Sequence, residues 1–203
     1  MHERLTSHWL VGFAVAYVVL HHIGTFLSPL GGPGATRWVD LVTPLVVLLP
    51  SAGLLRCVSR SVAQWALWLV GALIYTEGHG LHLAANSIYH VAPNDTAKLW
   101  DEVVGHLVWY AGFWLIIVVL AIALTKSSIQ LSGFGLLLAA LVGVTHATNG
   151  LGGDAPVPVV AAGIAFALAA LGLRLRSDAG RYLAVSYTVA IVTMAAALVS
   201  GWN

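Results

Sequence analysis

Seven apolar segments follow one another along this chain, and only short polar connections separate them. A helix that spans a membrane needs about 20 predominantly apolar residues, so seven of them use most of the 203 residues and leave no room for a soluble domain. The segments lie at about residues 8–27, 39–57, 62–88, 101–124, 129–150, 156–174 and 182–202. The sequence therefore predicts an all-α polytopic membrane protein in which residues 1–203 form a single seven-helix transmembrane domain.

The charge content supports the same fold class. Only 8% of the residues are charged and 59% are hydrophobic, whereas soluble domains carry about 25% charged residues. A net charge of +1 with scattered Lys and Arg provides no basic patch for nucleic acid. Cys57 is the single cysteine, so the chain forms neither an internal disulfide nor a multi-cysteine metal site. The expected partners are membrane lipid and a lipid-like substrate, and the sequence does not specify an oligomeric state.

Basic residues sort to one side of the predicted bundle. With seven spans, the N-terminus and every second connection share a side, and that side contains Arg4, Arg56, Arg60, Lys126, Arg174, Arg176 and Arg181. The other side contains Arg37 and Lys98. Because cytoplasmic loops are enriched in Lys and Arg, we expect the N-terminus inside and the C-terminus outside, in a plasma membrane of bacterial type.

Nine histidines stand out in a chain that otherwise avoids polar residues. Successive spans run in opposite directions, so most of these histidines converge in the outer halves of the spans or at their outer edge. They are His21, His22, His79, His82, His90, His106 and His146. Ionisable groups inside a membrane are costly and mark functional sites. The pattern therefore predicts one site in the outer half of the bilayer.

The histidine spacing is compatible with a metal centre. A polar stripe on one helix face consists of Tyr75, His79, His82 and Asn86. His79 and His82 are neighbours at i and i+3 and can both face one ion. Neutral imidazole is the commonest metal ligand in proteins. The candidate ligands are His22, His79, His82, His106 and His146, and they suit a divalent metal, with Zn²⁺ preferred over Fe²⁺.

Two glutamates are candidates for the catalytic base. Glu102 shares a helix face with His106 at i and i+4, while Asp101 falls on a different face. Glu77 lies about 200° around a regular helix from His79, and it joins the site only if the helix unwinds at the flanking glycines. A metal ion acidifies its bound water, and a carboxylate accepts the proton. We therefore expect a metal-dependent hydrolase that acts on a lipid or small amphiphile.

Two other functions can use the same residues. A proton or metal-ion transporter or channel would use the histidines and carboxylates as a relay. It would also need a polar path to the cytoplasmic side, for which Tyr187, Thr188 and Thr193 are the modest support. A haem-binding subunit would need two axial ligands from His22, His82, His106 and His146. In a structural subunit the histidines would serve only to hold helices together.

Seven spans with an embedded cluster of His and acidic residues resemble, in architecture alone, the alkaline ceramidase and adiponectin-receptor superfamily. The resemblance implies a zinc amide hydrolase. That superfamily carries an H-x-x-x-H pair in a late helix, whereas segments 156–174 and 182–202 contain no histidine. The chain departs from the superfamily at the residues that would carry its chemistry, so we do not assign it there.

Overall fold

The computed structural model describes residues 2–27, 38–127 and 129–201, and no strand occurs among them. The helices are α1 (His2–Leu27), α2 (Trp38–Val58), α3 (Val62–Val91), α4 (Asp95–Leu99), η2 (Trp100–Gly105), α5 (His106–Leu124), α6 (Gly133–Leu151), α7 (Val157–Arg174) and α8 (Asp178–Ser200). Helices α4 and α5 are joined without a break through η2, which is a turn of π-helix. The seven apolar segments thus correspond to seven long helices, and the predicted all-α polytopic bundle is confirmed.

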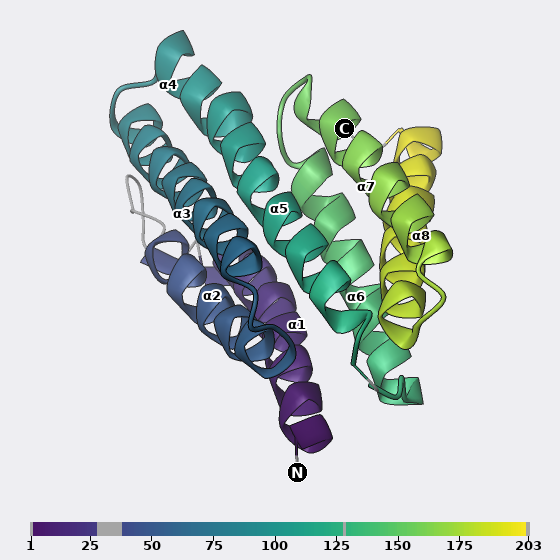
Figure 1. The fold of residues 1–203 in the computed structure, drawn as a ribbon. Coiled ribbons are helices and arrows are strands. Elements are labelled where there is room, and N and C mark those ends of the chain that lie inside the picture. The colour runs from purple at the N-terminus through teal and green to yellow at the C-terminus, as the bar shows by residue number, and fades with distance from the viewer. Residues whose placement is uncertain (1, 28–37, 128, 202–203) are drawn as a thin grey trace.

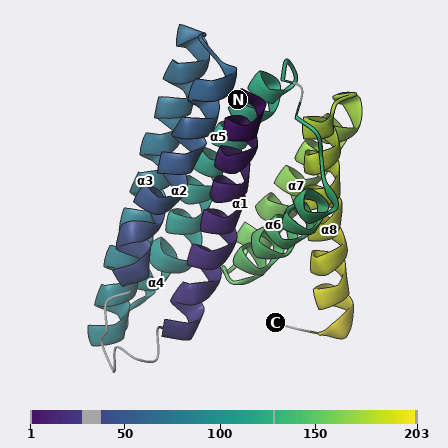
Figure 2. The same cartoon turned by 90° about the horizontal axis from the view of Figure 1, so that it is seen from below.

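The helices form two groups. The most extensive contacts within the first group join α3 to α5 and α1 to α2, and those within the second join α8 to both α6 and α7. Contacts between the groups are fewer and run mainly from α1 to α6. Figure 2 shows the two groups side by side, with α6, α7 and α8 apart from α1, α2, α3 and α5. The interface between the groups is therefore less tightly packed than either group.

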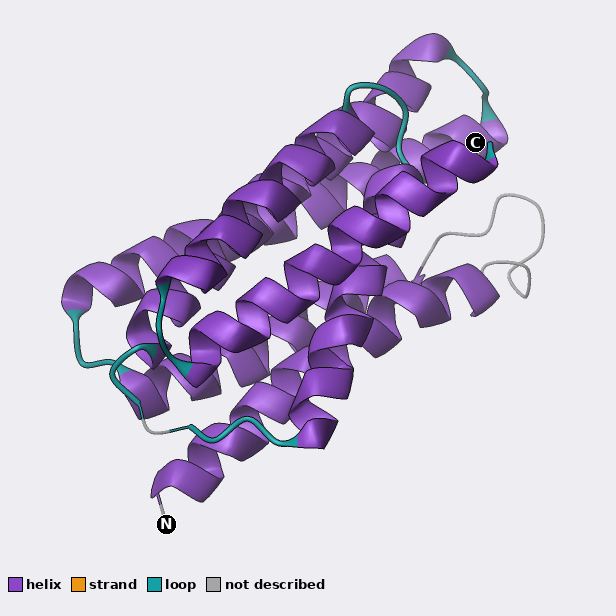
Figure 3. Ribbon diagram, turned by 90° about the vertical axis from the view of Figure 1, so that its right-hand side faces the viewer, coloured by secondary structure: helices purple, strands orange, loops and turns teal. Residues whose placement is uncertain are grey.

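The connections gather at the two ends of the bundle, as Figure 3 shows. We call one end the basic end. It holds the start of α1 and the α2–α3, α5–α6 and α7–α8 connections, with Arg60, Lys126 and Arg176. The opposite end, which we call the histidine end, holds the α3–α4 and α6–α7 turns. The start of α1 and the end of α8 lie at opposite ends (Figure 1). Seven passes therefore separate the termini, and which end faces the cytoplasm stays a prediction.

Two basic residues are expected at the histidine end, and the structure describes one of them. Lys98 of α4 lies there, and its Nζ is 2.9 Å from Oδ2 of Asp154 in an exposed ion pair. Arg37 lies outside the described residues. This ion pair joins the α6–α7 turn to α4. Exposed ion pairs of this kind contribute little to the free energy of unfolding.

Six helical segments are long and apolar enough to cross a membrane, and α3 is the exception. At 30 residues, α3 is about 45 Å long and exceeds the hydrocarbon thickness. Its hydropathy is lower because one face carries polar residues. Those residues, including Tyr75, His79, His82 and Asn86, are buried against the rest of the bundle. The helix thus lies beside α5 with its polar face turned toward the interior of the bundle.

The outer surface of the bundle is rich in exposed aliphatic side chains. Examples from different helices are Leu49, Leu73, Val159, Leu173 and Val199, each more than 60% exposed. Such a surface is costly in water, and large exposed apolar surfaces mark contacts with membranes or partners. The described helices therefore present a lipid-facing surface, which agrees with a multi-pass integral membrane protein.

Candidate functional site

Close approach of α3 and α5 brings the central histidines together. A Cβ atom added at Gly78 would overlap the backbone of Trp109, and one added at Gly112 would overlap the backbone of Tyr75. Small residues of this kind let membrane helices pack backbone against backbone. The histidines of α3 consequently face the first turns of α5 directly.

The π-helical turn η2 directs Asp101 into this interface. A π-helix pairs residues i and i+5, so Asp101 lies one turn before His106, and His106 Nδ1 is 3.0 Å from the Asp101 carbonyl oxygen. Asp101 is only 1% exposed. Gly105 allows the close packing here, because an added Cβ would lie 3.0 Å from the backbone nitrogen of His82.

Both carboxylate oxygens of Asp101 have partners on α3. His82 Nδ1 is 2.7 Å from Oδ1, and Asn86 Nδ2 donates to Oδ2 at 2.8 Å. His106 Nδ1 faces a carbonyl oxygen, which can only accept, so this nitrogen carries the hydrogen. In the neutral rings of His82 and His106, Nε2 is therefore the nitrogen available to take a proton or a metal ion.

Trp109 lies among imidazole rings from three helices. Its ring stacks on His79 at a centroid distance of 4.7 Å and on His106 at 5.0 Å. The ring of His21 from α1 lies 5.3 Å from Trp109, and His82 lies 4.9 Å from His106. We call the four histidines of this arrangement, His82, His106, His79 and His21, the imidazole row.

The imidazole row leads away from Asp101 toward α1. His21 lies 5.6 Å from His79 between ring centroids, and its Nε2 is 3.4 Å from the hydroxyl of Tyr75. His21 Nδ1 donates to the carbonyl oxygen of Tyr17 at 2.7 Å. The four imidazole rings thus lie in sequence from Asp101 at the histidine end toward Tyr17 in α1, with the Trp109 ring between His106 and His79.

His22 and His146, the other two predicted metal ligands, hold different helices together. His22 Nε2 is 3.0 Å from the hydroxyl of Thr145 and joins α1 to α6. His146 is fully buried, and its Nε2 donates to the carbonyl oxygen of Ala161 at 3.0 Å, which joins α6 to α7. Interhelical hydrogen bonds of this kind stabilise membrane bundles by about 0.6 kcal/mol each on average.

The predicted carboxylates lie in different surroundings. Glu77 is exposed on the opposite face of α3 from His79, and α3 stays helical through Gly78 and Gly80. The unwinding that would bring Glu77 into the site therefore does not occur. Glu102 is half-buried. The π-helical turn shifts the register by one residue, so Asp101 takes the place beside His106 that a regular helix would give to Glu102.

The five predicted metal ligands are not assembled around one point. In the part of the chain that the structure describes, no group of three or more His, Cys, Asp or Glu side chains has the spacing to hold a metal ion. His82, His106 and Asp101 lie in mutual contact. His22 and His146 instead have partners in other helix interfaces.

Sequence reasoning missed Asp101, because a regular helix turns it away from His106. No motif in this segment predicts a π-helical turn. The available signal was an acidic residue at the start of an otherwise apolar span, since a buried charge there needs a partner. Of the adjacent pair His21 and His22, sequence reasoning selected His22 as a ligand candidate, whereas the structure places His21 in the imidazole row.

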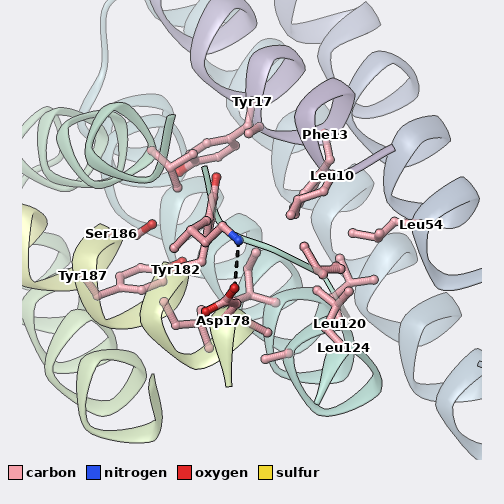
Figure 4. A pocket seen from close by; sticks show the side chains of 18 of the residues that line it. Leu10, Phe13, Tyr17, Leu54, Leu120, Leu124, Asp178, Tyr182, Ser186 and Tyr187 are labelled. Atoms are coloured by element: carbon pink, nitrogen blue, oxygen red, sulfur yellow. Dashed lines mark hydrogen bonds between the residues drawn. The ribbon is translucent and has the colours of Figure 1, made fainter. Parts of the chain in front are cut away.

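A pocket lies at the basic end, between α1 and α5 on one side and α8 on the other. It has about 680 Å³ of empty space. Figure 4 shows Leu10, Phe13 and Tyr17 of α1 on one wall and Tyr182, Ser186 and Tyr187 of α8 on another. Tyr17 belongs both to this wall and to the end of the imidazole row. The pocket and the row therefore meet at one side chain.

The histidine cluster and the pocket are described only from contacts within this chain. No family model matches the chain, and no curated protein or solved structure matches it.

Proposed function

We propose that this protein is a proton-conducting or proton-coupled membrane transporter whose protonation site is the Asp101–His82 pair. The observation that carries the proposal is the burial of this pair, with a 2.7 Å separation between His82 Nδ1 and Asp101 Oδ1. Ionisable pairs inside a membrane are expensive, and they recur as proton relays in pumps and transporters. Asn86 orients the second carboxylate oxygen and keeps the pair in place.

The direction of the imidazole row supports transport over a purely local reaction. Imidazole both takes and releases a proton near neutral pH. The row runs through His106, His79 and His21, with Trp109 between His106 and His79, and it ends where His21 bonds to the backbone carbonyl of Tyr17. A transporter needs a polar route across the bilayer. We propose that these side chains form part of such a route.

The test is proton flux into proteoliposomes that contain the purified protein and a trapped pH-sensitive dye. A potassium diffusion potential drives protons inward, and the dye reports the rate. We expect flux above protein-free vesicles, and a loss of at least tenfold in Asp101→Asn and in His82→Gln. Asp154→Asn is the matched control, because Asp154 is an exposed carboxylate at the same end of the bundle.

Two results would overturn this function. The first is wild-type flux equal to that of empty vesicles, with and without candidate neutral cargo molecules in the lumen. The second is flux that Asp101→Asn leaves unchanged in a protein shown to be folded by its unfolding transition. Equal loss in Asp101→Asn and Asp154→Asn would indicate a general effect of surface charge instead of a relay.

A metal-dependent hydrolase is the second candidate, and one observation favours it. The rings of His82 and His106 are 4.9 Å apart beside Asp101, and each has Nε2 as its available nitrogen. Imidazole nitrogens are donors that Zn²⁺ accepts, and Fe²⁺ less readily, so these two rings would supply part of a ligand shell. The remaining candidates, His79, His22 and His146, would have to move to complete the shell. A bound metal would supply Lewis-acid chemistry on a lipid ester or amide.

Elemental analysis and an absorption spectrum of the purified protein distinguish these functions. Stoichiometric Zn or Fe that is lost in a His82→Ala/His106→Ala double variant would favour the hydrolase. A Soret band would favour haem, the remaining alternative. Protein free of metal and haem that still conducts protons would favour the relay. We place each of these activities in a plasma membrane of bacterial type, since short connections with a basic bias toward one end suit such a protein.

A further inference from the structure

The pocket at the basic end is almost entirely hydrocarbon-lined. Side chains from five helices form it, including Phe13, Leu54, Phe113, Ile117 and Leu120. The empty space between these side chains, counted out to the open mouth of the pocket, is about 680 Å³. Such walls suit a hydrocarbon chain or ring.

Hydroxyl groups interrupt this lining on the α8 side. Ser186 is 0% and Tyr187 is 1% exposed, and both line the pocket. Neither hydroxyl has a hydrogen-bond partner among the residues that the structure describes, and the same holds for the Tyr182 hydroxyl. A polar group that is buried without a hydrogen-bond partner destabilises the folded protein. Three such groups in one cavity point to a molecule that supplies the missing partners.

On the α1 side, the Tyr17 hydroxyl lies beside the side-chain amide of Asn149. Tyr17 and the hydroxyl-bearing residues of α8 line the same pocket. A ligand oxygen near Ser186 and Tyr187 would complete the hydrogen bonding of both side chains. The rest of such a ligand would lie along the apolar walls.

The charges around the pocket exclude an anionic head group. No Lys, Arg or His side chain is part of the lining that the structure describes. Asp178, the one acidic residue in the lining, accepts from the backbone nitrogen of Leu131 at 2.8 Å and pairs with Arg181 at 3.1 Å. Arg181 is already paired with Asp178, so an anion in the pocket would find no unpaired cation in this lining, and burying a charge without a partner is highly unfavourable.

We propose that this pocket binds a neutral lipid whose polar end is a single hydroxyl or carbonyl oxygen. The oxygen bonds to Ser186 and Tyr187, and the chain lies against the apolar walls. Access is between the two helix groups, because the walls belong to α1 and α8, which make no extensive contact within the described residues. This site goes beyond the proton relay and does not depend on it.

The test uses tritiated 1-hexadecanol as the probe and detergent-solubilised full-length protein in a scintillation proximity assay. We expect saturable binding that unlabelled hexadecanol displaces. Hexadecane lacks the oxygen and palmitate at pH 8 carries a charge, so each is expected to compete at least tenfold more weakly at equal chain length. Ser186→Ala and Tyr187→Phe are each expected to weaken binding roughly fivefold, the equivalent of one hydrogen bond.

Controls separate this site from a general hydrophobic effect and from the relay. Thr188→Val removes an exposed hydroxyl from the same helix outside the pocket, and it is expected to bind hexadecanol as the wild type does. Asp101→Asn is also expected to bind normally, so a failure of the proton relay and a failure of the lipid site give different results. Thermal unfolding shows whether each variant is folded. If one of Ser186→Ala and Tyr187→Phe does not fold, the other is used for the binding test.

Three outcomes would overturn the proposal. Wild-type protein that shows no saturable hexadecanol binding means that the hydroxyls face water alone. Hexadecane that competes as well as hexadecanol means that the oxygen has no partner in the pocket. Folded Ser186→Ala and Tyr187→Phe proteins that both bind like the wild type mean that the probe sits elsewhere.

Discussion

The approach of α3 to α5 makes a quantitative prediction at Gly78. Replacing it with alanine places a Cβ about 2.5 Å from Cα of Trp109 and 2.6 Å from Cβ of that residue. Carbon atoms prefer separations of about 3.5–4.0 Å, so α3 and α5 must move apart by about 1 Å. These are atoms on or next to the backbone of α5, and no side-chain rotation removes the overlap.

Gly80 supplies the matched comparison. It lies two residues further along the same helix, and a Cβ added there meets nothing within 4 Å. Both glycines gain the same helix propensity on becoming alanine, about 1 kcal/mol, so the difference between the variants isolates the overlap. Overpacking of a tight interface costs about 1–3 kcal/mol. Gly78→Ala should therefore be less stable than Gly80→Ala by about 1–3 kcal/mol.

The measurement is thermal unfolding of both variants in one detergent, followed by circular dichroism. For a chain of this length the expected difference in Tm is roughly 2–12 °C. We also expect Gly78→Ala to reduce proton flux, since Trp109 carries the stacked rings of the imidazole row. Equal Tm values for the two variants, or a higher value for Gly78→Ala, would refute the reasoning that the backbones are in contact.

Three further predictions follow from the hydrogen bonds and the order of the helices. Asn86→Ala removes the donor to Asp101 Oδ2 and should lower the free energy of unfolding by about 1–3 kcal/mol, while Ser87→Ala, whose bond lies within α3, should change it by less than about 0.5 kcal/mol. His146→Phe leaves the Ala161 carbonyl without its donor and should cost about 0.6–1.7 kcal/mol in denaturant unfolding, and a wild-type midpoint would contradict this. A protease-sensitive tag placed after α8 should be cleaved from outside intact cells, and cleavage only after lysis would reverse the orientation.

The architecture could be predicted from the sequence because the bilayer restricts the choice of structures. Backbone groups in lipid must be satisfied within the segment, so long apolar runs translate directly into helices. The convergence of histidines from alternate directions also identified where the polar interior lies. His79, His82 and His106 are in contact with one another or with Trp109, as that convergence implied.

The detailed partners could not be predicted, because they depend on a local departure from α-helical geometry. A regular helix rotates about 100° per residue, so the π-helical turn exchanges the expected neighbour Glu102 for Asp101 beside His106. At Glu77 the sequence suggested a helix break at the flanking glycines, but α3 is a regular helix there. Glu77 therefore stays on the face opposite His79. The roles of His22 and His146 depend on Thr145 and Ala161, which lie in other segments and leave no trace in local spacing.

The double position of Tyr17 has a thermodynamic consequence. Its ring forms part of the pocket wall, and its carbonyl oxygen holds the Nδ1 hydrogen of His21. A molecule that displaces Tyr17 on entering the pocket changes the free energy of protonating His21. Linkage makes this effect reciprocal, so a proton on His21 changes the affinity of the pocket by the same factor. Tyr17 is thus the residue through which such a coupling between the pocket and His21 would act.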